Sequence, residues 1–303
     1  MKNLVILFSG TSLAINHLFK KVGMESVYQN FMHLGKKEGV FISISIPSLV
    51  KGIRIDKAIT YQGRWTTVRN IRADYIFDKL SYGGRRKQII KKVSKHIKVI
   101  NDPDLSLICD NKLLTYKTFL QFSPQTFSVT RENFREVVEK IQSRKIVLKP
   151  WYGSNSNGIV IKKKSQVCPK DIGNQYIVQE YIDTRGGIKG IPRPNTLRFI
   201  VFNGEIVFYT LETAKEGEMI SGNVKAVKVS KNDIPFRKIK KILNEIDYVF
   251  RNYFPRLYCV DFSITKEGKI CIAEINSKPG LYPSEGESQA DYDKVIKRVF
   301  RSL

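Results

Sequence analysis

The chain has 303 residues, of which 42% are hydrophobic, and these values predict a folded globular protein whose core is divided among two or three subdomains. No stretch approaches the ~20 consecutive apolar residues that a membrane-spanning helix needs, so an integral membrane protein is excluded and a cytoplasmic location is expected. The formal net charge is +24, from 52 Lys+Arg against 28 Asp+Glu, which makes the chain strongly basic.

This charge predicts an acidic macromolecular partner, and three classes stay open: nucleic acid, an acidic carrier or protein tail, and an anionic envelope surface. Nucleic acid is the less favoured class, because no RNA-binding motif and no row of interleaved aromatic residues accompanies the basic clusters. The alternative is a solvated surface that only aids solubility.

The first part of the chain alternates strand and helix patterns. The segments 4–8 and 40–46 predict buried strands, whereas 13–21 and 27–36 predict helices. We therefore expect residues 1–105 to form a small α/β domain with a mostly parallel sheet.

A strand, a loop and a second strand follow at residues 146–161. The loop carries two glycines and two serines within six residues, namely Gly153, Ser154, Ser156 and Gly158. Backbone N–H groups of such a loop can fold over phosphate oxygens, and Lys149 adds a positive charge from the preceding strand. No helix follows the loop directly, which excludes a Walker A loop and a Rossmann fingerprint. An ordinary surface hairpin is the alternative.

The next short apolar strand ends in polar residues over 179–183. This segment is either a plain core strand or a hinge whose edge backbone pairs with a purine. A basic loop follows at 184–195, and its three glycines and two prolines exclude a continuous helix. The loop is expected to bind an anionic substrate through Arg185, Lys189 and Arg193, unless it is only a solvated surface loop.

Two apolar runs near the C-terminus are separated by Lys266-Glu267-Gly268, and this pattern predicts a β-hairpin. Residues two apart on a strand share a face, so Glu274 and Asn276 lie side by side, and Asp261 can face them from the partner strand. Such hard oxygens suit Mg²⁺, with Mn²⁺ as the alternative ion. Beyond the hairpin, two further residues are expected to line the substrate pocket from the other side: Lys278 and Tyr282.

Five segments occur in an order typical of one family, and over about residues 100–282 the chain resembles the ATP-grasp carboxylate–amine ligases. The segments are 111–115, 147–150 with its glycine loop, 179–182, 195–199, and Asp261 with 274–276. Within the family, the segments 198–205 and 214–223 resemble the ribosomal-protein glutamate ligases and the spore-coat-associated ATP-grasp proteins. The resemblance implies an α/β (α+β) ATP-grasp fold, with a small subdomain at 106–180 and a C-terminal subdomain at 181–303.

The resemblance also implies ATP and Mg²⁺ as cofactors and assigns residues to them. Lys112 and Lys149 would contact the phosphates together with the glycine loop, and Arg198 would stabilise the charge on the transferred phosphoryl group. The adenosine would be held by Gln179, Glu180, Tyr181, Ile182 and Asp183. The metal ligands would be Asp261, Glu274 and Asn276.

The activity that follows from the resemblance is amide or peptide bond formation through an acyl phosphate, with release of ADP and phosphate. The substrates would be small-molecule or peptide carboxylates and amines. The alternatives are a basic nucleic-acid- or envelope-binding protein on an ATP-grasp scaffold, and an ATP-grasp kinase.

Overall fold

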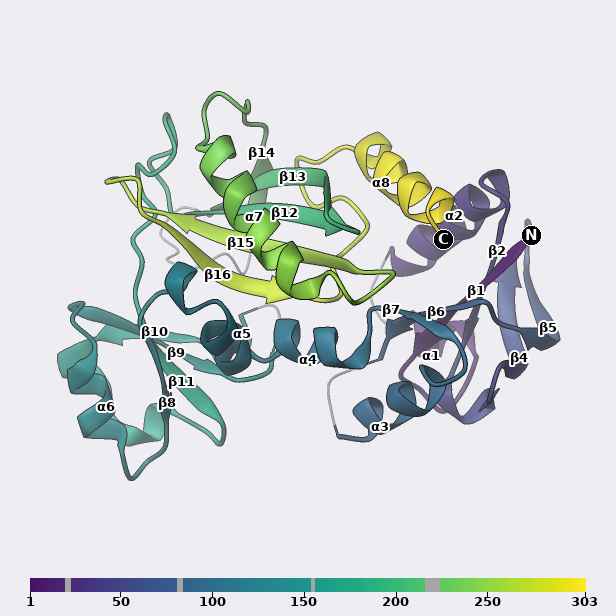
Figure 1. The fold of residues 1–303 in the computed structure, drawn as a ribbon, viewed down its shortest axis with the longest axis horizontal. Coiled ribbons are helices and arrows are strands. Elements are labelled where there is room, and N and C mark those ends of the chain that lie inside the picture. Colours follow the sequence, from purple (N-terminus) through teal and green to yellow (C-terminus); the bar gives the residue numbers. More distant parts are fainter. Residues whose placement is uncertain (20–22, 81–83, 154–155, 216–223) are drawn as a thin grey trace.

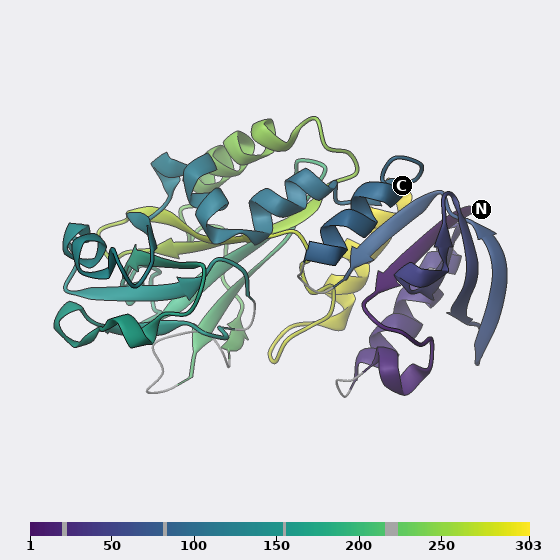
Figure 2. The same cartoon turned by 90° about the horizontal axis from the view of Figure 1, so that it is seen from below.

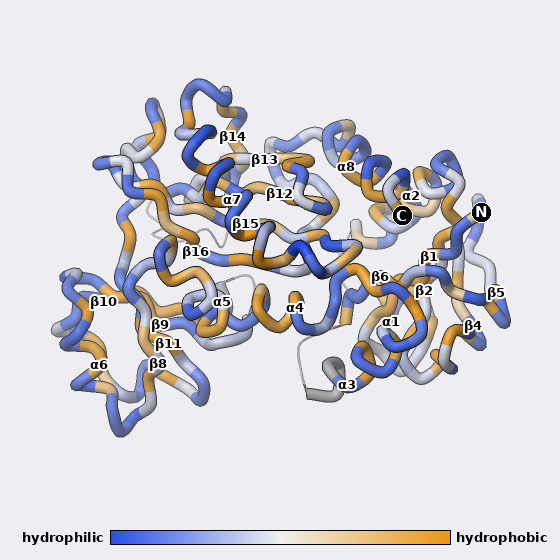
Figure 3. The backbone as a smooth tube through the Cα atoms, in the orientation of Figure 1, coloured by the Kyte–Doolittle hydropathy of each residue, from blue (hydrophilic) through white to orange (hydrophobic). Residues whose placement is uncertain are grey.

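A computed structural model describes residues 1–19, 23–80, 84–153, 156–215 and 224–303. Within these ranges the strands form three sheets, and the part that holds the C-terminal sheet lies between the other two along the long axis (Figure 1). Hydrophobic residues gather along the strands, whereas the connecting loops at the periphery are mostly hydrophilic (Figure 3). None of the helices in the described ranges is long and apolar enough to cross a membrane.

The N-terminal sheet has the strand order β3-β4-β2-β1-β6-β7, with β5 paired to β4. The expected parallel pairing is confirmed for β1, β2, β6 and β7, whereas β3, β4 and β5 form an antiparallel extension. The strands are β1 Lys2–Phe8, β2 Val40–Ser45, β3 Val50–Lys51, β4 Arg54–Tyr61, β5 Trp65–Arg72, β6 Tyr75–Lys79 and β7 Lys98–Ile100. The helices are α1 Ile15–Leu18, α2 Met24–Lys37 and α3 Gly84–Val93, with a 3₁₀ turn at Pro47–Leu49.

The middle sheet is antiparallel, with the order β10-β9-β11-β8. It contains β8 Thr126–Val129, β9 Lys145–Pro150, β10 Val160–Lys163 and β11 Tyr176–Glu180. Its helical segments are α6 Phe134–Lys140 and the 3₁₀ turns Leu120–Phe122, Lys164–Gln166 and Pro169–Asp171. The predicted strand–loop–strand is therefore the hairpin of β9 and β10.

The C-terminal sheet is antiparallel as well, with the order β14-β13-β12-β15-β16. It contains β12 Asn195–Phe202, β13 Glu205–Ala214, β14 Val224–Val227, β15 Leu257–Ile264 and β16 Ile270–Asn276. One face is covered by α7 (Phe236–Phe250), whose buried residues recur at the helical period: Ile239, Leu243, Ile246 and Phe250. The opposite face packs partly against α8 (Gln289–Arg301) and the N-terminal sheet. The rest of that face carries the polar residues described below.

Two helices connect the outer sheets to the C-terminal one. α4 (Pro103–Asp110) and α5 (Lys112–Thr118) run along β16 in both views (Figures 1 and 2). Asn101 donates to the backbone oxygens of Leu257 and Ser277, at 2.6 Å each, so the end of β7 is fixed to β15 and to the residue after β16. The predicted domain limits near residues 105 and 180 stay predictions.

Candidate active site

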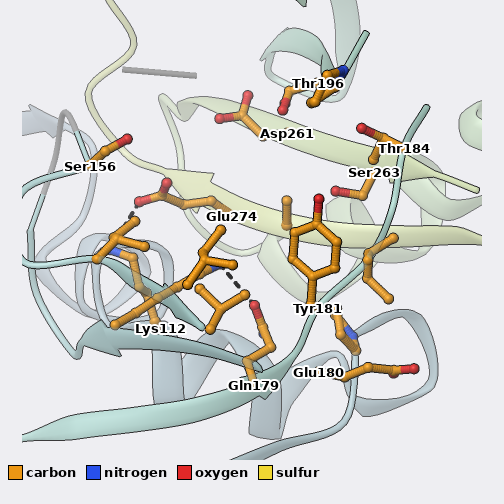
Figure 4. Close-up of a pocket in the computed structure, with 18 of the residues that line it drawn as sticks. Lys112, Ser156, Gln179, Glu180, Tyr181, Thr184, Thr196, Asp261, Ser263 and Glu274 are labelled. Carbon is orange, nitrogen blue, oxygen red and sulfur yellow. Dashed lines mark hydrogen bonds and ion pairs between the residues drawn. The ribbon is translucent and has the colours of Figure 1, made fainter. Parts of the chain in front are cut away.

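A pocket lies between the middle sheet and the open face of β15 and β16 (Figure 4). Ten of the residues expected at the nucleotide or metal site line it: Lys112, Lys149, Gly153, Ser156, Gln179, Glu180, Tyr181, Ile182, Asp261 and Glu274. The chain therefore brings together residues that are more than 160 positions apart in sequence.

Other expected residues lie beside this pocket and do not line it. Arg198 and Asn276 occupy β12 and β16 near it, and Gly158 accepts a hydrogen bond from the Tyr176 hydroxyl at 3.1 Å. Asp183 accepts from the Arg185 guanidinium, with Nε to Oδ1 at 2.9 Å, so this carboxylate is engaged next to the hinge. Ser154 lies outside the described residues.

The two lysines of the site enter from different elements. Asn111 caps α5 by accepting from the N–H groups of Leu113 and Leu114, and this cap fixes Lys112 in the first turn. Lys112 Nζ donates to the Gly153 carbonyl at 2.9 Å and lies 3.1 Å from Glu274 Oε1. The glycine loop and the metal hairpin are therefore linked through one ammonium group.

Lys149 projects from β9, and its Nζ donates to Gln179 Oε1 at 2.8 Å. The Gln179 amide in turn donates to Thr126 Oγ1 at 2.8 Å, which fixes its orientation. Burial lowers the pKa of Lys149 to about 8, although Glu274 acts in the opposite direction. A phosphate bound beside this lysine would raise the pKa again, because an anion favours the protonated form.

The hinge segment leaves the middle sheet after β11. The Glu180 N–H donates to the Gln125 carbonyl at 2.8 Å, and the Tyr181 N–H donates to the Lys145 carbonyl at 3.4 Å. Because these two N–H groups are used within the fold, a backbone N–H donor to a purine would have to come from beyond them, at Ile182. The Tyr181 ring also lines the pocket, where it offers an apolar surface to a flat base (Figure 4).

The predicted metal ligands lie on the hairpin of β15 and β16. Asp261 and Glu274 are direct cross-strand partners, and a β-bulge follows Asp261. Asn276 pairs with Cys259, two positions further along the hairpin. No cluster of three His, Cys, Asp or Glu side chains placed to hold a metal ion occurs among the residues that the structure describes. Two carboxylates and an amide fit Mg²⁺, which usually completes its shell with water and substrate phosphates.

Arg198 joins Asp261 to a second carboxylate that the sequence did not indicate. Its Nε and Nη2 donate to the two oxygens of Asp261 at 2.8 Å each, and Nη1 donates to Glu212 Oε1 at 2.7 Å. Asp261 is the main reason that the pKa of Arg198 is raised. Burial raises the pKa of Glu212 to about 7, with Arg198 opposing and Asp261 and Glu287 adding to the rise.

Sequence alone missed several residues that line the pocket, including Thr184, Thr196 and Ser263. It also missed the hydrogen bond from Arg198 to Glu212. Ser263 could have been found, because it follows Asp261 by two on β15 and therefore shares its face. Glu212 gives no such signal, since its partner Arg198 is set by the register of β12 against β13.

The structure does not bring the five expected substrate-binding residues into one cluster. Arg185, Lys189 and Arg193 belong to the exposed loop before β12, and Gly187 in that loop packs against Ile264 at the turn end of the hairpin. Lys278 follows the other end of β16. β16 has seven residues, so these groups lie about 20 Å apart along the strand.

Lys278 also makes contacts with the N-terminal part of the chain that the sequence did not predict. Its Nζ donates to the Leu80 carbonyl at 2.7 Å and lies 3.3 Å from Asp78 Oδ2, and the side chain is 13% exposed. Tyr282 remains 38% exposed. Of the five residues, these two stay next to the part of the site where the N-terminal sheet meets the hairpin.

Residues 109–300, more than half of the chain, match the family described as the RimK-like ATP-grasp domain. Solved structures are similar over almost the whole chain. D-cycloserine synthetase DcsG has 10% identity and a TM-score of 0.65, with 98% of this chain and 99% of that chain covered. D-alanyl-alanine synthetase A from Vibrio cholerae has 15% identity and a TM-score of 0.62, with 99% and 98% covered.

The ATP-grasp ligase PsnB, in complex with a minimal precursor, has 10% identity and a TM-score of 0.63, with 99% of this chain and 98% of that chain covered. No curated protein matches the chain significantly. At these identities the solved structures show the fold alone, which is the ATP-grasp fold.

The chain belongs to the RimK-like ATP-grasp family. The predicted fold and the predicted enzyme class are thereby confirmed: the protein is an ATP-dependent ligase that forms carbon–nitrogen bonds and uses ATP and Mg²⁺.

Proposed function

We propose that the protein converts a carboxylate into an acyl phosphate with the γ-phosphate of ATP, and that an amine then displaces phosphate to give an amide. An unactivated carboxylate does not react with an amine at neutral pH, so the phosphoryl transfer supplies the leaving group. Such a transfer depends on positioning and charge neutralisation more than on acid–base side chains. The pocket that unites Lys112, Lys149, Glu274 and Asp261 is the observation that carries this proposal.

The nucleotide would lie across the pocket with its base at the hinge and its phosphates under the glycine loop. Glu180, with the backbone near Tyr181 and Ile182, would hold the base, and Asp183 would reach the sugar. Lys112 and Lys149 would contact the phosphates, and Gly153 and Ser156 would offer backbone N–H groups from above. Both lysines are already within hydrogen-bond distance of oxygen acceptors, at Gly153 and Gln179, so phosphate oxygens would replace existing partners.

The metal ligands would be Asp261, Glu274 and Asn276. When bound there, Mg²⁺ would neutralise charge on the phosphates and fix their position. Both oxygens of Asp261 accept from Arg198. A metal ion bound at these oxygens would repel the guanidinium and compete with it for the carboxylate charge, so binding of the metal nucleotide would loosen this ion pair, while Nη1 stays bonded to Glu212.

Arg198 would then be the catalytic cation. With Nη1 held by Glu212, the released Nε and Nη2 donors can point toward the oxygens of the phosphoryl group in transit. Hydrogen-bond donors whose acceptor becomes charged only in the transition state raise the rate of the chemical step without raising the affinity for the substrate. Arg198 thus differs in role from Lys112 and Lys149.

The substrate classes come from the molecules that similar proteins act on by name. D-cycloserine synthetase and D-alanyl-alanine synthetase point to small amino acids, and the PsnB complex points to a peptide. We propose a small or peptide-borne carboxylate as the acid substrate. The anionic-substrate roles of Arg185, Lys189 and Arg193 stay predictions, as do an acidic macromolecular partner and the cytoplasmic location.

The test measures ADP and phosphate release with Mg²⁺–ATP against pairs of acids and amines, including D- and L-amino acids, glutamate and acidic peptides. We expect stoichiometric ADP and phosphate that require both an acid and an amine. ADP release with an acid alone, with phosphate retained on the product, would instead identify a kinase and contradict the proposal.

A further inference from the structure

Lys79 lies where an open α/β sheet normally receives its ligand. β1 is the central parallel strand, and the chain passes to β2 on one side and later to β6 on the other. Such a reversal is a topological switch point, and ligands bind outside the carboxyl ends of the strands that flank it. Lys79 is the last residue of β6 and is the register partner of Phe8, the last residue of β1.

The side chain of Lys79 continues a buried stripe. Tyr75, Phe77 and Lys79 share one face of β6, and the two rings belong to the core that joins the N-terminal sheet to β12 and β15. Lys79 Nζ lies 4.6 Å from the centroid of the Phe77 ring. The ammonium group therefore lies at the rim of an apolar core and not on an open surface.

This ammonium group has a backbone carbonyl but no carboxylate as its partner. Nζ donates to the Pro279 oxygen at 3.2 Å, and no acidic side chain among the described residues lies within ion-pair distance of it. The adjacent Asp78 lies 3.3 Å from Lys278. Burial lowers the pKa of Lys79 to about 7, and Lys278 adds to this effect, whereas Asp78 opposes it. The side chain is therefore partly uncharged in the free protein, and an anionic ligand beside it would favour the protonated form.

Lys79 contacts the segment that follows the metal hairpin, and it is not among the residues that line the nucleotide pocket. Pro279, which accepts its hydrogen bond, follows the proposed ligand Asn276 by three residues. Cys259 belongs to the same core as Phe77, over which the Lys79 ammonium group lies. Cys259 precedes Asp261 by two positions on β15, so about 7 Å of strand separates these two residues. An acid with two carboxylates, such as glutamate, could place one near Lys79 while the other reacts with the nucleotide.

We propose that Lys79 binds a carboxylate of the acid substrate and holds it in the interface between the N-terminal sheet and the metal hairpin. This assignment rests on the proposed function and adds the position from which the acid approaches the nucleotide. The alternative is a structural lysine that ties β6 to Pro279. The two interpretations predict different effects of Lys79 on the stability of the free protein. A structural lysine stabilises the fold, whereas a lysine kept without a counterion for a ligand lowers the stability.

The test compares Lys79→Met, Lys79→Arg and a matched control, Lys98→Met. Lys98 belongs to the same parallel sheet, but it is the first residue of β7, at the amino end of the parallel strands, and it is exposed. Binding of glycine, D-alanine, L-glutamate and glutarate to the full chain is measured by calorimetry in the presence of a non-hydrolysable ATP analogue and Mg²⁺. The melting temperature Tm and the Kd of the ATP analogue are measured for each variant.

For the acid that binds the wild type most tightly, we expect Lys79→Met to raise Kd at least tenfold and Lys79→Arg to raise it less. The Kd of the ATP analogue should change less than twofold, and Tm should stay the same or rise. Lys98→Met should change none of these values. Failure of all four acids to bind the wild type, unchanged acid affinity in Lys79→Met, or a lower Tm with unchanged affinity would overturn the assignment.

The proposed function is tested separately by the same proteins. If an acid binds in a Lys79-dependent way but no acid and amine pair releases ADP from the wild type, the carboxylate site stands and the ligase chemistry falls. If ADP release requires an acid but Lys79→Met leaves the KM for that acid unchanged, the ligase chemistry stands and the Lys79 site falls.

Discussion

The proposed site has two halves that differ in how their cationic side chains are paired. The nucleotide half contains Lys112, Lys149 and Arg198, and the acid half is the region around Lys79. In the nucleotide half, Lys112 faces Glu274, and Arg198 is held by both Asp261 and Glu212. In the acid half, Lys79 has a single carbonyl partner. Apart from Lys149, whose partner is the Gln179 amide oxygen, the cations of the nucleotide half are thus paired with carboxylates before the ligand arrives. The acid half instead holds a lysine without a carboxylate partner, whose protonated form an anionic ligand would favour.

This contrast predicts opposite effects on stability. Removing Arg198 leaves Asp261 and Glu212, which are both buried, without their shared partner, and this is strongly unfavourable. Removing Lys79 leaves no such group. The following predictions probe the nucleotide half, beginning with the largest effect.

Glu274→Gln should abolish turnover, by about a thousandfold or more, because it removes a negative metal ligand and several kcal/mol of transition-state stabilisation. The fold should persist, since the amide is nearly isosteric with the carboxylate. Steady-state ADP release at saturating Mg²⁺ checks this expectation. Glu267→Gln, at the exposed turn of the same hairpin, is the control and should retain full activity. Normal Mg²⁺-dependent ADP formation by Glu274→Gln would remove the metal-site assignment.

Arg198→Ala should lower kcat about 10²- to 10³-fold, the range for loss of a donor that acts in the transition state, with much less change in the Kd of ATP. It should also lower Tm, because Asp261 and Glu212 are both buried and would lose their shared partner. Single-turnover rates and thermal unfolding give the two readouts. An unchanged Tm would contradict the view that these carboxylates depend on their shared partner.

Lys149→Ala should raise the Kd of ATP about ten- to a hundredfold, because a hydrogen bond to a charged group contributes roughly 1.5–3 kcal/mol. The rate of the chemical step at saturating ATP should fall less than in Arg198→Ala. Nucleotide titrations of both variants separate these roles. Equal losses of ATP affinity in the two variants would show that the cations share one function.

ATP affinity should depend on pH with a midpoint set by Lys149. Its pKa in the free protein is lowered to about 8, and bound phosphate favours the protonated form. Affinity is therefore constant below about pH 8 and falls above it, by at most tenfold per pH unit. Titrations from pH 7 to pH 9.5 test this, and the trend should be absent in Lys149→Ala. A decline of the same size in that variant would assign the proton to another group.

The two halves also differ in how far the sequence could predict them. The nucleotide half is encoded in short segments: a glycine loop after a strand, and a hairpin whose alternation places Asp261 opposite Glu274, as the register confirms. The glycine-loop segment included Lys149, whereas Lys112 was assigned only by the resemblance to the ATP-grasp family; both lysines line one pocket. These are local patterns, which can be recognised in the sequence without knowledge of the fold.

The acid half is assembled from distant parts of the chain and could not be predicted. Lys79 meets Pro279 across 200 positions, and only the parallel pairing of β6 with β1 places it at the switch point. Glu212 reaches Arg198 through a strand register that no motif specifies. The basic loop at Arg185 was the nearest cationic cluster in sequence to Arg198, but its packing at the turn end of the hairpin became visible only in the fold.

The most direct test of the central claim follows an oxygen atom. The acid that supports the highest ADP release is labelled with ¹⁸O in its carboxylate, and the phosphate released in the presence of the amine is analysed by mass spectrometry. If the carboxylate attacks the γ-phosphorus and the amine later displaces phosphate, each phosphate carries one ¹⁸O from the acid. Phosphate without the label would contradict an acyl phosphate, and with it the proposed mechanism.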